Sequence, residues 1–151
     1  MNLADLLGAA ATRDPTRPAI TDLASGRSLD YATLAGRVDD AARQLRAAGV
    51  ERGQRVALAA ENALGHVPAA FGILAAGACL VPLAPTLRPA EVAAVLEETD
   101  VNARVTLRDD APVLEWIDRK REPPPGFAAT DAAFIRFTGG VGGCPACCAS
   151  A

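Results

Sequence analysis

The sequence is poor in aromatic residues and carries little net charge, and both shortages narrow its possible function. Phe, Trp and Tyr make up 4% of the 151 residues, and the formal net charge is −3. Nucleic-acid binding normally requires a basic stripe with aromatic residues nearby, so no nucleic-acid partner is expected. Hydrophobic residues reach 50%, which argues against disorder and predicts one domain with a core of Ala, Val, Leu and Ile.

The sequence also lacks a clear signal for secretion or membrane insertion. Met1–Asp5 has an acidic residue where a signal peptide would carry basic ones. The stretch between Glu61 and Arg88 contains no formal charge and is long enough to cross a bilayer. However, Pro and Gly interrupt it, and a buried helix followed by a buried strand explains it better. We therefore expect a cytoplasmic protein with no membrane span.

Helical and extended patterns alternate along the chain, which predicts an α/β fold built on a parallel sheet. Helices are expected after the N-caps Asn2 and Asp30, between Asn62 and Gly77, and from Pro89. The apolar runs expected to form strands are 19–22, 27–29, 56–59, 79–81, 101–107 and 133–137.

Apolar spacing predicts which helix faces are buried. Leu34, Val38, Ala41 and Leu45 recur at helical spacing, and Gly49 supplies the end of their helix. The residues expected to face the core from the next helix are Val67, Ala70, Phe71 and Leu74.

Two boundaries later in the chain rest on weaker patterns. Pro82 is expected to close the strand that begins at Cys79. Residues 112–121 are expected to form one more helix, because their basic end would suit the dipole at a helix C-terminus.

Cysteines are few, and their placement does not form a disulfide framework. Three of the four, Cys144, Cys147 and Cys148, lie in the last eight residues. With Cys79 or His66 they could form part of a zinc site or a redox pair. The second ligand pair of a zinc site is missing, so exposed thiols on a disordered tail are the favoured interpretation and no metal site is predicted.

No catalytic constellation emerges from the remaining polar residues. His66 lies near a helix start, without a recognisable nucleophile nearby, and is interpreted as a structural or surface residue. The acidic pairs 39–40, 97–98 and 109–110 are interpreted as solvated surface. No catalytic residue is therefore predicted.

One glycine-rich segment is of a kind that can bind phosphate. A predicted strand runs into Thr138–Gly143, and backbone N–H groups in such a glycine-rich loop can approach a phosphate closely. The segment is neither a Walker loop nor a dinucleotide fingerprint, because it lacks the Gly-Lys-Ser/Thr sequence and the following helix and acidic residue. On its glycines alone, an ordinary flexible tail is favoured over a phosphate site.

Five earlier segments occur in an order and spacing that together carry a resemblance. They are LDYATL at 29–34, GVERGQRVA at 49–57, AFGILAAGA at 70–78, VPLAP at 81–85 and TLRPAE at 86–91. Together they resemble the acyl- and amino-acid-adenylating superfamily, which includes acyl-CoA synthetases, luciferases and peptide-synthetase adenylation domains. The segment 86–91 is closer in style to acyl-CoA synthetases of fatty acid metabolism, and the resemblance covers the chain up to Thr138.

The resemblance implies that the next element is a phosphate loop of the form Thr-Ser-Gly-Thr-Thr-Gly-x-Pro-Lys-Gly. The positions that keep the backbone outline of this loop are Thr138, Gly140, Gly143 and Pro145. The positions that lose a hydroxyl group, the lysine or the last glycine are Gly139, Val141, Gly142, Ala146 and Cys147. An earlier departure is Gln54, which replaces the Asp usual in this family.

For function, the resemblance implies a ligase that uses ATP and Mg²⁺ to convert a carboxylic acid into an acyl-adenylate, which usually passes to CoA. Residues 1–138 would be a partial AMP-binding (adenylation) domain, with 139–151 as a Gly/Cys-rich tail at the phosphate-loop position. Losing three hydroxyl groups and an ammonium removes about 4–8 kcal/mol of phosphate binding. We therefore expect this incomplete domain to bind ATP weakly and to be inactive alone.

Three interpretations of the whole chain remain open at this stage. The first is a truncated or frameshifted ligase, because the family's adenine, ribose, Mg²⁺, hinge and catalytic-lysine motifs would all follow residue 151. The second is a non-catalytic α/β interaction module, which could pair with a separately encoded remainder of the enzyme. The third is a small cysteine-dependent metal or redox protein.

Overall fold

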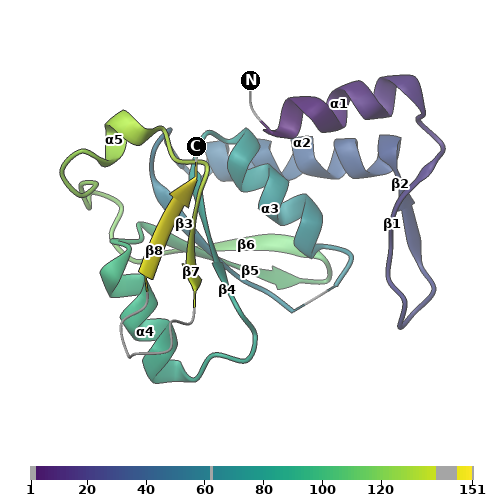
Figure 1. The fold of residues 1–151 in the computed structure, drawn as a ribbon. Coiled ribbons are helices and arrows are strands. Elements are labelled where there is room, and N and C mark those ends of the chain that lie inside the picture. Colours follow the sequence, from purple (N-terminus) through teal and green to yellow (C-terminus); the bar gives the residue numbers. More distant parts are fainter. Residues whose placement is uncertain (1–2, 62, 139–145, 151) are drawn as a thin grey trace.

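The computed structural model describes residues 3–61, 63–138 and 146–150, which form helices on both sides of a six-stranded sheet (Figure 1). The helices are α1 (Leu3–Arg13), α2 (Tyr31–Ala47), α3 (His66–Ala75), α4 (Pro89–Glu98) and α5 (Phe127–Thr130). The strands are β1 (Pro18–Thr21), β2 (Ser28–Asp30), β3 (Arg55–Ala59), β4 (Cys79–Leu83), β5 (Ala103–Arg108), β6 (Ala111–Trp116), β7 (Phe134–Thr138) and β8 (Ala146–Ser150). The predicted α/β fold is confirmed.

The main sheet is parallel at its centre and antiparallel at both sides. Its strand order is β6-β5-β3-β4-β7-β8, and β1 and β2 form a separate antiparallel pair. Strands β3, β4, β5 and β7 run parallel, whereas β6 and β8 run antiparallel to β5 and β7. The four parallel strands therefore begin at one edge, the amino edge, and end at the other, the carboxyl edge.

Helix α2 forms as predicted from its cap and its apolar stripe. The Asp30 carboxylate accepts a hydrogen bond of 2.8 Å from the backbone N–H of Thr33, which satisfies one of the free donors at the helix start. The four residues of the predicted stripe are all buried: Leu34, Val38, Ala41 and Leu45. Gly49 follows the helix with φ of +92°, a conformation that glycine adopts without strain.

The two faces of the sheet are covered unequally. Val56 and Leu58 of β3 point to the α2 and α3 side, where they pack with Ile73 in a fully buried cluster. Ala57 points to the opposite side, where Val92 and other apolar residues of α4 are only partly buried. No residue of α4 is fully buried, so the α4 side is the more open face.

Helix α3 begins later than the sequence pattern predicted. It starts at His66, and Asn62 lies outside the described residues. A helix starting at 62 would place Pro68 in its interior, where proline lacks the N–H and clashes with the preceding turn. Starting at His66 places Pro68 in the first turn, where it is tolerated.

The buried face of α3 also differs from the predicted one. Of the predicted residues, Leu74 is buried, whereas Val67, Ala70 and Phe71 are half-buried. The buried residues of the helix are Pro68, Ala69, Gly72, Ile73 and Leu74. A Cβ atom at Gly72 would lie 2.5 Å from the Cβ of Ala41. Glycine at this position therefore permits the close approach of α2 and α3.

The predicted helix at 112–121 is wrong. Residues Ala111–Trp116 form β6, which pairs antiparallel with β5 and alternates between exposed and half-buried side chains. Asp109 and Asp110 form the turn between these strands with φ of +51° and +62°. Two-residue hairpin turns favour residues that tolerate positive φ, and Asp is among them. The acidic pair interpreted as solvated surface is therefore a hairpin turn.

Pro82 does not close its strand, as had been expected, because β4 continues to Leu83. The N–H of Leu80 donates to the Ala133 carbonyl on the β7 side of β4. The backbone nitrogen of Pro82 faces the same side, since it lies two residues further along. In the described part of the sheet, β4 pairs with β7 only at Leu80 and Phe134, so the missing N–H of Pro82 removes no hydrogen bond between these strands.

Candidate functional site

The predicted phosphate-loop position lies at the carboxyl edge of the sheet. Thr138 is the last residue of β7, whereas Gly140 and Gly143 lie outside the described residues. Thr138 pairs with Ala146, the first residue of β8. Residues 139–145 therefore connect two strands whose facing ends are held together at the edge where parallel α/β sheets bind ligands.

The expected disordered tail is wrong for residues 146–150, which form β8 (Figure 1). The pairing runs from Thr138 and Ala146 to Phe134 and Ser150. This strand supplies backbone partners for an edge of β7 that would otherwise be unpaired. Cys147 therefore belongs to a strand in the main sheet rather than to a disordered segment.

Helix α4 begins close to the same edge with a charged pair. The Arg88 guanidinium donates to Glu91 at 2.9 Å, and the Glu91 carboxylate also accepts the Arg88 backbone N–H at 2.8 Å. Hydrogen bonds from the Arg88 side chain and backbone lower the pKa of the Glu91 carboxyl to about 2. The charge of Arg88 is thus engaged in capping its own helix.

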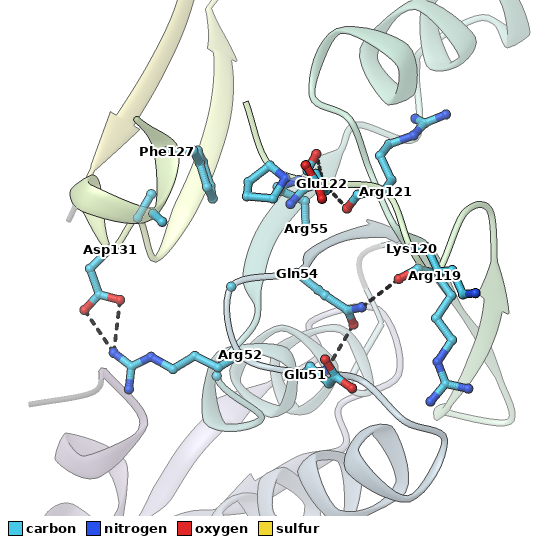
Figure 2. Close-up of a pocket in the computed structure, with 15 residues that line it drawn as sticks. Glu51, Arg52, Gln54, Arg55, Arg119, Lys120, Arg121, Glu122, Phe127 and Asp131 are labelled. Atoms are coloured by element: carbon cyan, nitrogen blue, oxygen red, sulfur yellow. Dashed lines mark hydrogen bonds and ion pairs between the residues drawn. The ribbon is translucent and has the colours of Figure 1, made fainter. Parts of the chain in front are cut away.

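A pocket lies at the opposite, amino edge (Figure 2). Its volume is about 730 Å³. One wall comes from the turn 51–55, which enters β3, and the other comes from the connection 119–132, which leads to β7. Because these segments are distant in sequence, the pocket exists only once the sheet has formed.

Arg55 connects the two walls of the pocket. It is 1% exposed, and its guanidinium donates to the backbone carbonyls of Asp100, Arg121 and Glu122 at 2.7–3.2 Å. The same guanidinium lies 5.8 Å from the centre of the Phe127 ring. Burial lowers the pKa of Arg55, and the Asp100 carboxylate acts in the opposite direction.

Two further contacts tie the two walls of the pocket together (Figure 2). Gln54 accepts a hydrogen bond from the Glu51 N–H at 3.0 Å and donates to the Arg119 carbonyl at 3.1 Å. Arg52 donates to both carboxylate oxygens of Asp131 at 3.1 and 3.2 Å. The Arg52–Asp131 pair is exposed, so it contributes little stability by itself.

Comparison with known proteins identifies the family of this chain. A family model described as AMP-binding enzyme matches residues 7–149. The chain belongs to this family. It is 32% identical over 149 residues to the nonribosomal peptide synthetase lenA of Aspergillus lentulus and 34% identical over 142 residues to the pyochelin synthetase PchF of Pseudomonas aeruginosa.

The fold agrees with solved structures of the same kind. The N-terminal domain of FACL13 from Mycobacterium tuberculosis superposes with a TM-score of 0.79 at 22% identity, covering 99% of this chain and 44% of that one. The matches to lenA and PchF cover 89% and 87% of this chain but only 3% and 8% of those proteins. The chain thus spans a small part of the curated relatives it matches.

Cys79, His66 and Asp110, which were considered from the sequence, each lie at a defined place in the fold. Cys79 is buried in β4, and burial raises the pKa of its thiol to about 11, so this thiol is protonated at neutral pH. His66 opens α3 and is half-buried. The Asp110 carboxylate accepts a hydrogen bond of 3.1 Å from the Gly65 N–H. Asp110 therefore satisfies a backbone donor at the N-cap of α3.

Two features are absent from the part of the chain that the structure describes. No cluster of three or more His, Cys, Asp or Glu side chains in this part of the chain is placed to hold a metal ion. Among the same residues, no helix combines the length and apolar character needed to cross a membrane.

The amino-edge pocket was not predicted from the sequence. Its only local signal was the basic run Arg119–Arg121, which was assigned to the end of a helix that does not exist. The contacts that build the pocket depend on Arg55 and Gln54, which lie more than sixty residues earlier in the chain than Arg119 and Arg121.

Proposed function

We propose that this chain is part of an adenylating domain. In the complete protein, a carboxylate would attack the α-phosphate of ATP, forming an acyl-adenylate and releasing pyrophosphate. The observation that carries this proposal is the β7–β8 pairing at Thr138 and Ala146, which holds the ends of segment 139–145 together at the carboxyl edge. Residues 1–138 would then be the partial adenylation domain, with 139–151 at the phosphate-loop position.

Within that loop, we propose that Thr138, Gly140 and Gly143 keep the outline that presents backbone N–H groups to phosphate. The hydroxyl and ammonium groups that would add charge-assisted hydrogen bonds are absent from Gly139, Val141 and Ala146. The described residues offer no carboxylate cluster that fits Mg²⁺. We therefore propose that the chain alone binds neither ATP nor Mg²⁺ tightly and does not catalyse adenylation.

The acyl-adenylate would pass to a thiol, and two acceptors have support. Segment 86–91 favours CoA, in the manner of acyl-CoA synthetases. The similarity to lenA and PchF favours the second candidate, a carrier-bound thiol as in peptide synthesis. The cytoplasm, where ATP and CoA are available, is the compartment we propose for either reaction.

The test is ATP–pyrophosphate exchange with the purified chain and a panel of carboxylic acids, beside a complete family member as a positive control. We expect no exchange above the protein-free background from the chain alone. Acid-dependent exchange from the chain alone would overturn the proposed inactivity. Exchange that appears only when the rest of an adenylation domain is added as a second chain would support a separately encoded remainder.

A further inference from the structure

The amino-edge pocket lies at the opposite end of the parallel strands from the phosphate-loop position. Its volume of about 730 Å³ falls within the range of small-molecule sites. It shares no residue with the segment 138–146, so an inference about it is independent of the proposed adenylating function.

Positive charge is concentrated around this pocket although the protein as a whole is acidic. Five cationic and three anionic residues line the pocket, an excess of two positive charges, whereas the whole chain has a net charge of −3. The cationic residues are Arg52, Arg55, Arg119, Lys120 and Arg121. A concave site with this excess attracts anions and raises their local concentration.

Apolar side chains form part of one wall of the pocket. Phe127, Pro123, Ala128 and Ala132 all come from the connection 119–132 and line the pocket. An apolar wall beside a cationic rim matches a ligand that has both an anionic head group and a flat apolar body.

The walls are held in place without a ligand. Buried Arg55 fixes the backbone at Arg121 and Glu122, while Gln54 fixes the Glu51 turn against Arg119. Binding would therefore require little ordering of the protein, and the entropic cost of ordering a site is one of the main costs of association.

Gln54 also removes a negative charge from the lining of the pocket. The similar family segment has Asp at this position, and this chain has a neutral amide whose two ends bond to Glu51 and Arg119. A carboxylate here would repel an anionic ligand, so the departure from the family pattern favours anion binding in this chain.

We propose that the amino-edge pocket binds a small organic anion. The carboxylate or phosphate head group faces the cationic rim formed by Arg119 and Lys120, because Arg52 is already paired with Asp131. The apolar body packs against Phe127.

Titration with phenyl phosphate and with benzoate tests the proposal and separates the two head groups. Binding is followed by amide proton–nitrogen NMR and by the fluorescence of Trp116, the only tryptophan, whose ring centre lies 5.0 Å from the Arg119 guanidinium carbon. We expect saturable shifts at Gly53 and Gln54 with a Kd of about 1 mM or tighter for at least one probe. Inorganic phosphate, which lacks the apolar body, should bind at least about tenfold more weakly than phenyl phosphate.

A matched pair of charge variants tests the location. Gln54→Asp places a carboxylate in the pocket, whereas Gln44→Asp places one on the exposed surface of α2. We expect Gln54→Asp to weaken binding about fivefold or more and Gln44→Asp to leave it within about twofold. Lys120→Ala, which removes an exposed cation of the rim, should also weaken binding.

Several results would overturn the proposal. One is the absence of saturable binding by both probes, and another is equal loss of affinity in Gln54→Asp and Gln44→Asp. Shifts confined to the region of Thr138 would place the ligand at the carboxyl edge instead. Equal affinity for inorganic phosphate and phenyl phosphate would show that the apolar wall takes no part. Unchanged NMR dispersion in each variant confirms that the fold is intact.

Discussion

The two edges of the same sheet differ in how they use polar groups. At the amino edge, buried Arg55 and the bridging Gln54 connect segments more than sixty residues apart. At the carboxyl edge, where the family pattern places its phosphate loop, Gly139, Val141 and Ala146 stand at positions expected to carry hydroxyl and ammonium groups. The comparison teaches that a buried cation and an amide organise the amino edge of this chain, whereas the polar groups of the family loop are absent from its sequence at the carboxyl edge.

The largest expected effect is at the amino edge. Arg55→Met keeps much of the apolar stem but leaves the carbonyls of Asp100, Arg121 and Glu122 without their charged donor. We expect a loss of about 3–5 kcal/mol in the free energy of unfolding, measured by urea denaturation. The control is Arg104→Met on the neighbouring strand, where the partly exposed pair with Glu115 should contribute less than about 1 kcal/mol. Equal effects of the two changes would contradict the special role of Arg55.

Packing between α2 and α3 provides a stability change for comparison that involves neither edge of the sheet. Gly72→Ala forces a Cβ toward Ala41, and overpacking of this kind costs about 1–3 kcal/mol. Gly36→Ala in α2 meets no atom within 4 Å and should instead raise the free energy of unfolding by up to about 1 kcal/mol. The melting temperatures of the two variants should therefore shift in opposite directions.

A smaller effect is expected from the β5–β6 turn near the carboxyl edge. Asp110→Ala removes the acceptor for the Gly65 N–H and places alanine at a positive φ, so it should cost about 1–2 kcal/mol. Asp110→Asn keeps both an acceptor and tolerance of positive φ and should cost less. If chemical denaturation gives the two variants equal stability, the hydrogen bond to α3 contributes nothing.

The smallest effect concerns Glu91, whose pKa is depressed in the folded state by Arg88. A depressed carboxyl pKa adds stability above its ordinary pKa of 4.5, and this stability is lost as the pH falls toward about 2. The stability difference between the native chain and Glu91→Gln should thus be constant near neutral pH and shrink through this acidic range. Denaturation curves across pH test this, and a difference that grows on acidification would contradict the assignment.

Features fixed by local sequence were predictable. The Asp30 cap, the α2 stripe and the buried strand at Cys79 depend on neighbouring residues, and the structure confirms all three. The hairpin at Asp109–Asp110 was missed because the basic end of residues 112–121 suggested a helix. In the structure, pairing with β5 holds residues 111–116 as a strand instead. The pocket around Arg55 could not be predicted, because its walls meet only through tertiary contacts.

The phosphate-loop positions were predictable only from family resemblance. The predicted strand before the loop is present as β7 and extends to Thr138, one residue further than expected. The binding role of Thr138, Gly140 and Gly143 stays a prediction. The continuation of the chain into β8 was missed because the composition of 144–151 gives no extended pattern, and pairing with β7 supplies the order.

The most direct test of the central claim compares pyrophosphate binding, in the presence of Mg²⁺, to the native chain and to a loop-restored variant by isothermal titration calorimetry. The variant carries Gly139→Ser, Val141→Thr, Gly142→Thr and Ala146→Lys. We predict that it binds at least about a hundredfold more tightly, because hydrogen bonds to charged groups contribute roughly 1.5–3 kcal/mol each. Equal affinity of the two proteins would contradict the account that the native chain keeps this loop's frame but has lost its binding groups.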